Sequence, residues 1–115
     1  MWGTPIGAHQ AIAHPLARAH VAVEAARLLT ARAAALHGAG LPAGSAANMA
    51  KLTAADAAAQ ALDAAIQTHG GNGMATEYGL STLSGLVRLF RIAPVSAEMI
   101  LSRIAQHDLG LPSSY

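Results

Sequence analysis

A glycine cluster at residues 70–73 directly follows a long alanine-rich segment that has the apolar spacing of an amphipathic helix. Three of these four residues are glycine, so a regular helix is expected to end here, and the bare backbone N–H groups lie open to a ligand. The cluster fits a helix C-cap with a turn, or a site for a phosphate or pyrophosphate. It is neither a dinucleotide-binding fingerprint nor a P-loop, because the required glycine spacing and the Gly-Lys-Ser/Thr ending are absent.

Four segments have apolar residues at steps of three and four, which is typical of amphipathic helices. The predicted helices cover residues 7–36, 46–68, 79–91 and 96–107. The glycine- and proline-rich loop at 37–45 is short, so the first two helices are expected to be antiparallel neighbours. No segment alternates like a strand. The sequence therefore predicts one all-α domain over residues 1–115, an up-down helical bundle with two long antiparallel helices plus two shorter ones.

Each long helix has one apolar stripe that is expected to be buried. The stripe of the first helix contains Ile12, Leu16, Ala19, Val23, Ala26 and Leu29, and that of the second contains Met49, Leu52, Ala55, Ala59, Leu62 and Ile66. Charged residues of the second helix expected to face solvent are Lys51, Asp56 and Asp63. Pro15 either kinks the first helix or lies in its first turn. Ser45 and Ser96 are the predicted N-caps of the second and last helices.

The composition predicts that much of the surface is covered by other protein. The chain is 53% hydrophobic and 11% charged, and with only 3% aromatic residues its alanine-lined seams bury little area each. Oligomerisation or docking on other domains is expected to supply the missing burial. The net charge of +1, without a basic stripe, gives no support for nucleic-acid binding.

Other classes of site and location are excluded or disfavoured by residue usage. The chain has no cysteine, which excludes disulfides, thiolate zinc ligands and thiol catalysis within it. We expect no metal site, because His9, His14 and His20 are five and six residues apart and do not share a helix face. No apolar run reaches the length of a membrane span, and no signal pattern opens the sequence, so we expect a cytoplasmic protein.

Three motifs in one order give the chain a specific resemblance. The first is Trp2-Gly3 followed by His9-Gln10, at the start of the first long helix. The second is Gln67-Thr68-His69-Gly70-Gly71-Asn72-Gly73, and the third is Val87-Arg88-Leu89-Phe90-Arg91. They are similar to the aromatic-Gly segment, the Q-x-x-G-G-x-G loop and the R-aliphatic-aromatic-R segment of the acyl-CoA dehydrogenases, a family of flavoproteins. The chain resembles only the C-terminal helical domain of that family.

The resemblance implies a bundle without its first helix, and the amino-terminal helical domain and middle β domain of the family are also absent from this sequence. In the family the glycine loop contacts the ADP half of FAD, commonly a flavin held mainly by a neighbouring subunit. Residues implied to bind FAD are His9, Gln10, Gln67, Thr68, His69, Gly70 and Gly71. The implied substrate of the complete enzyme is an acyl-CoA thioester, and the implied assembly is a homo- or hetero-oligomer.

The chain departs from the family at the catalytic base. Family members commonly carry a Glu in an E-G-T segment after the third motif, and here Pro94 falls at that position. Glu98 is the one nearby carboxylate, so it is the single candidate base, with a role at the start of the last helix as the alternative. Two functions therefore remain as alternatives. The chain is part of an acyl-CoA dehydrogenase-like enzyme, or it is a non-catalytic association module that pairs with a related subunit.

Overall fold

The computed structural model describes residues 3–113, and every regular element in this range is helical. The α-helices are α1 (Gln10–Gly38), α2 (Gly44–His69), α3 (Leu80–Phe90) and α4 (Ala97–His107). Three short 3₁₀ helices accompany them: η1 (Ile6–Ala8), η2 (Gly70–Met74) and η3 (Thr76–Tyr78). The predicted all-α class, with two long helices and two shorter ones, is confirmed.

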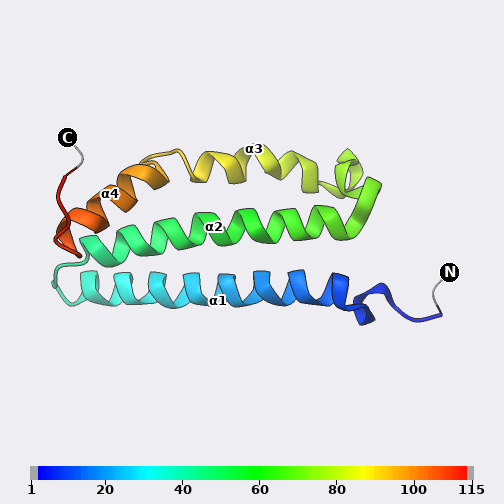
Figure 1. Ribbon diagram of the computed structural model, residues 1–115, viewed down its shortest axis with the longest axis horizontal. Helices are drawn as coiled ribbons and strands as arrows, with labels where there is room; N and C mark the ends of the chain where they lie inside the picture. The colour runs from blue at the N-terminus through cyan, green and yellow to red at the C-terminus, as the bar shows by residue number, and fades with distance from the viewer. Residues whose placement is uncertain (1–2, 114–115) are drawn as a thin grey trace.

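The long helix α2 lies in the middle of the molecule, with α1 antiparallel along one side and α3 and α4 along the other (Figure 1). The described chain measures 55 × 27 × 26 Å. Within residues 3–113, α2 contacts each of the other three α-helices, whereas α1 contacts neither α3 nor α4. The faces of α2 that lie between α1 and the α3–α4 pair are therefore not covered by any helix of the described chain.

Alanine dominates the buried positions. The buried apolar residues are Ala19 and Ala26 of α1, Ala46, Ala50, Ala55, Ala57 and Ala64 of α2, and Ala97 and Ile100 of α4. Small side chains allow the backbones of α1 and α2 to lie close together, but each contributes little buried area. Among the described residues, Ile100 has the only large side chain that is fully buried, at 2% exposure. No residue of α3 is buried.

Most predicted helix boundaries lie within a few residues of the observed ones, and two predictions about helix starts are wrong. Helix α1 begins at Gln10 and runs through Pro15, so a start at Pro15 is wrong. The predicted N-cap at Ser45 is also wrong. The Ala47 N–H already donates to the Ala43 carbonyl at 2.8 Å, so α2 begins before Ser45. The Ser45 hydroxyl instead donates to the Asp108 carboxylate, which lies beyond α4.

The predicted cap of the last helix is confirmed, and one stripe residue is not. The Met99 N–H donates to Ser96 Oγ at 3.3 Å, so the serine satisfies one of the first-turn donors of α4. In α1, Ala19 and Ala26 of the predicted stripe are buried, but Leu16 is 41% exposed. Within the described residues, α2 is the only α-helix that contacts α1. The part of the Leu16 side chain that α2 does not cover therefore stays exposed.

Candidate functional site

The first two implied FAD-binding segments meet at one end of the bundle. Because α1 and α2 are antiparallel, the start of α1 lies beside the end of α2 (Figure 1). His9 is the residue before α1 and Gln10 is its first residue, and both are exposed. Gln67 lies in the last turn of α2 and is also exposed. Residues separated by more than fifty positions in the sequence are thus brought to one end.

Two adjoining hollows occupy this end. A hollow of about 330 Å³ is lined by Ala11, Ile12, His14, Pro15, Arg18, Gln60, Asp63, Ala64, Gln67 and Thr68. A second, of about 400 Å³, is lined by Ile6, His9, Ala11 and Ile12. Ala11 and Ile12 line both, so the two hollows adjoin, and together they are called the depression; His9 of the first motif and Gln67 of the second border it. Gln10, His69, Gly70 and Gly71 line neither hollow.

The polar side chains at the end of α2 are held by its own backbone. Thr68 Oγ1 donates to the Ala64 carbonyl at 2.7 Å. His69 Nδ1 lies 2.8 Å from the Ala65 carbonyl, and a carbonyl only accepts, so Nδ1 carries the proton. The His69 ring also meets the Tyr78 ring edge-on, with centroids 5.8 Å apart. These contacts fix the orientation of the Thr68 and His69 side chains without any ligand.

The structure explains two of the three glycines after α2, and it explains each in a different way. Gly70 is the C-cap of α2 with φ 59°, a left-handed conformation that other residues adopt at a cost. A Cβ added to Gly73 would lie 2.5 Å from the Ile66 carbonyl oxygen, so Gly73 is required for close packing of η2 on α2. A Cβ added to Gly71 meets nothing within 4 Å. Neither conformation nor packing within the described chain requires glycine at Gly71.

The open position at Gly71 is compatible with a ligand, and Gly7, Gly38, Gly44 and Gly85 are equally open. A glycine that its own chain does not need leaves the backbone accessible to a group from outside. The predicted C-cap is confirmed at Gly70, and the ligand role of the cluster stays a prediction. The bordering side chains that can form hydrogen bonds include the Gln67 amide and the imidazoles of His9 and His14.

Both arginines of the third motif lie between α2 and α3. Arg91 Nε lies 3.2 Å from Asp56 Oδ1, which ties α2 to the end of α3. Arg88 lines a hollow of about 210 Å³ between α2 and α3. Since both partners of the Arg91–Asp56 pair are partly exposed, the pair contributes little to stability.

Glu98, the candidate base, is exposed in the first turn of α4. The pKa of its carboxyl is lowered from the ordinary 4.5, because its own backbone N–H and the Ser96 hydroxyl hydrogen-bond to it. The positive charges of Arg91 and Arg88 lower it further. A general base that works near neutral pH is usually tuned upward instead. The geometry therefore favours the alternative, a first-turn carboxylate that stabilises the start of α4.

Sequence reasoning did not assign several residues that border the depression. They are Ile6, His14, Arg18, Gln60 and Asp63. The available signal was spacing: Gln60, Asp63 and Gln67 lie on one face of α2 at steps of three and four, as do His14 and Arg18 on α1. Those positions look like ordinary solvent-facing residues until the pairing of α1 with α2 is known.

Among residues 3–113, no group of three or more His, Cys, Asp or Glu side chains is arranged to hold a metal ion. In the same range, no helix combines the length and hydrophobicity that crossing a membrane requires.

Comparisons with known proteins point to one family. A family model described as the acyl-CoA dehydrogenase C-terminal domain matches residues 1–109. Acyl-CoA dehydrogenase FadE12 of Mycobacterium tuberculosis (strain ATCC 25618 / H37Rv) is 54% identical over 117 residues, covering 100% of this chain and 30% of the relative. An acyl-CoA dehydrogenase of Bacillus subtilis (strain 168) is 38% identical, covering 95% and 29%. Acyl-CoA dehydrogenase family member 11 of Rattus norvegicus is 35% identical, covering 94% and 14%. The chain thus spans 30% or less of the length of these relatives.

Proposed function

Because the chain belongs to the acyl-CoA dehydrogenase family through its C-terminal domain, we propose that it supplies part of the FAD site and subunit interface of a longer enzyme. The reaction proposed for that enzyme is α,β-dehydrogenation of an acyl-CoA thioester. FAD, when bound, accepts the hydride in such a reaction. This chain contributes contacts to the cofactor, and the base that removes the α-proton lies elsewhere in the enzyme.

The observation that carries the proposal is the open backbone at Gly71, at the end of the bundle where Gln67 and His9 border one depression. Gly71 gives the ADP part of FAD a close approach to the main chain, and the Gln67 amide donates to or accepts from it. Thr68 and His69, which α2 already orients, and Gly70, which turns the chain, complete the contact surface. His9 and Gln10 contribute from the start of α1.

The test is the flavin content of the complete gene product that carries this chain. Gln67→Ala combined with Gly71→Val removes one hydrogen-bonding amide and fills the open backbone position. We expect FAD binding to weaken roughly tenfold or more, since a lost hydrogen bond in a desolvated site is worth about 1–3 kcal/mol. The readout is the ratio of visible flavin absorbance to protein absorbance after purification.

Gly85→Val is the matched control. Gly85 lies within α3, and a Cβ added there also meets nothing within 4 Å. This variant should retain its flavin, and both variants should unfold at nearly the same temperature. Full flavin content in the double variant would remove the FAD role of the loop. It would also favour the non-catalytic association module as the function of this chain.

A further inference from the structure

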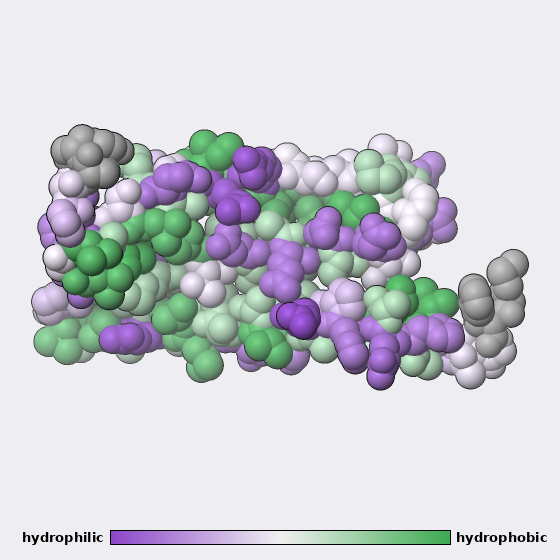
Figure 2. Space-filling model, in the orientation of Figure 1, coloured by the Kyte–Doolittle hydropathy of each residue, from purple (hydrophilic) through white to green (hydrophobic). Residues whose placement is uncertain are grey.

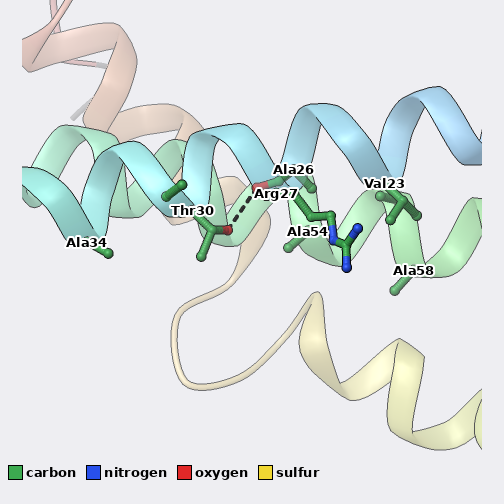
Figure 3. Close-up of a pocket in the computed structure, with 9 residues that line it drawn as sticks. Val23, Ala26, Arg27, Thr30, Ala34, Ala54 and Ala58 are labelled. Atoms are coloured by element: carbon green, nitrogen blue, oxygen red, sulfur yellow. Dashed lines mark hydrogen bonds between the residues drawn. The ribbon is translucent and has the colours of Figure 1, made fainter.

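The hollow between α1 and α2 that Figure 3 shows offers little to a polar ligand. It has a volume of about 540 Å³, and its lining is mostly alanine. Its two polar side chains are already engaged. Thr30 Oγ1 donates to the Ala26 carbonyl at 2.8 Å (Figure 3). Arg27 Nη1 lies 3.1 Å from Glu24 Oε1. Hydrophilic residues are plentiful over the start of α1 (Figure 2), at the end of the bundle that carries the glycine cluster.

His69, the last residue of α2, offers one hydrogen-bond acceptor at that end. Its Nδ1 carries the proton that is donated to the Ala65 carbonyl, at 2.8 Å. In a neutral imidazole whose Nδ1 is protonated, the other nitrogen, Nε2, is an acceptor. The side chain is exposed, so Nε2 is accessible to a donor group of a ligand. A phosphate oxygen only accepts at neutral pH, so it is a poor partner for this nitrogen.

The ring of Tyr78 gives the imidazole a second restraint. The two rings meet edge-on, with centroids 5.8 Å apart and an angle of 66° between their planes. This is a geometry that aromatic pairs prefer. A single hydrogen bond holds an exposed side chain only weakly, because water competes for it. The ring contact and the Nδ1 hydrogen bond together fix the direction in which Nε2 points.

Tyr78 is held in place from the other side of the glycine loop. It is the last residue of η3, and its N–H donates to the Ala75 carbonyl at 3.2 Å. The next residue, Gly79, has φ 72°, and its carbonyl accepts from Thr82 Oγ1 at 2.6 Å in the first turn of α3. The backbone of η3 approaches η2 and α3 but not α2. The two rings therefore bridge the two ends of the glycine loop.

Core packing does not explain an aromatic ring at this position. The chain is only 3% aromatic. Tyr78 is 52% exposed, so its ring buries little area within the described chain. The contact with His69 is the specific interaction of this ring.

We propose that Tyr78 is a positioning residue of the FAD site, which holds His69 so that Nε2 accepts a hydrogen bond from the ADP part of the cofactor. This rests on the proposed function. The ADP part has two kinds of donor, the ribose hydroxyls and the adenine amino group, whereas its phosphates only accept. The partner of His69 is therefore in the adenosine of FAD and not in its pyrophosphate. Tyr78 acts through His69 and does not touch the cofactor.

The test is the dissociation constant of FAD from the complete gene product, measured by flavin fluorescence after the flavin has been removed. Tyr78→Leu releases the imidazole, and an orientation that is populated only part of the time weakens binding in proportion. We expect roughly two- to tenfold weaker binding. Tyr78→Phe keeps the ring and is the matched control, with an affinity within about twofold of the unmodified protein. Because Tyr78 is half-exposed, both variants should unfold at nearly the same temperature.

Substitutions of His69 separate positioning from a general effect on the loop. In His69→Leu the imidazole is absent, so adding Tyr78→Leu should weaken FAD binding no further. His69→Gln carries an amide oxygen that can accept near the position of Nε2, and it should recover part of the affinity. His69→Lys only donates, and it should bind FAD no better than His69→Leu. These comparisons also decide the matter if Tyr78→Leu does not accumulate.

Two cofactor analogues identify the donor. One carries purine in place of adenine and lacks the amino group, and in the other the adenosine ribose lacks both hydroxyls. The analogue without the partner of His69 should bind more weakly than FAD to the unmodified protein, but as tightly as FAD to His69→Leu.

Four results would overturn the assignment. They are an equal effect of Tyr78→Leu with and without His69, a Tyr78→Phe variant as weak as Tyr78→Leu, tight binding by His69→Lys, which would make phosphate the partner, and no difference between either analogue and FAD. If these results occur while Gln67→Ala with Gly71→Val still lowers flavin content, the FAD role of the loop survives without the role of Tyr78. A complete gene product that binds no FAD would end both.

Discussion

Gly73→Ala is expected to lower the free energy of unfolding by about 1–3 kcal/mol, the usual cost of forcing an extra group into a packed site. The new Cβ would lie 2.5 Å from the Ile66 carbonyl oxygen and 2.9 Å from its Cα. Both are backbone atoms, which cannot rotate away as a flexible side chain could. The loop η2 must therefore separate from the end of α2.

The measurement for this prediction is the urea midpoint of the complete gene product, with the slope of the transition recorded for both proteins. Gly71→Ala is the control, because a Cβ there meets nothing within 4 Å. It should shift the midpoint little. Equal midpoints for the two variants would show that the packing of η2 on α2 is not as described. The Gly73 variant should also lose flavin, since the loop that carries Gly71 moves with it.

Ile100→Ala is expected to destabilise the protein by about 2–5 kcal/mol, the range measured for truncating fully buried aliphatic side chains. Ile100 has the one large side chain that is fully buried among the described residues, and the other buried apolar residues are all alanine. Alanine has no side-chain rotamers with which to fill a cavity. Helix α4 should therefore loosen from α2 first.

Leu101→Ala serves as the control for this second prediction. Leu101 is the next residue on α4 but is 54% exposed, so its truncation should change stability by less than about 0.5 kcal/mol in this chain. Thermal unfolding followed by circular dichroism checks both variants. Similar losses for Ile100→Ala and Leu101→Ala would mean either that the burial of Ile100 is not as described or that an additional element of the protein covers Leu101.

The helices were predictable from the sequence because their causes are local. Apolar spacing identified all four α-helices, and Ser96 caps α4 as expected. The failure at Ser45 has a distant cause, because its hydroxyl is used by Asp108, 63 residues further along the chain. No local pattern contains that pairing. Likewise, the exposure of Leu16 depends on which helices lie beside α1.

The candidate site was only partly predictable for a related reason. The sequence identified Gln67 and the glycines as a group, but it could not say that Gly70 serves conformation, Gly73 packing, and Gly71 neither. It also left Arg18 and Gln60 among ordinary helix-surface residues. They border the depression only because α1 pairs with α2 in one particular register.

The intact mass of the native gene product, isolated from its source with an antibody to this segment, is the decisive measurement. If the chain is the C-terminal part of an acyl-CoA dehydrogenase-like enzyme, the mass will be several times the 11.6 kDa of these 115 residues. The additional sequence should then contain the catalytic base. A mass near 11.6 kDa would contradict that function and leave the association module, with its partner, as the alternative.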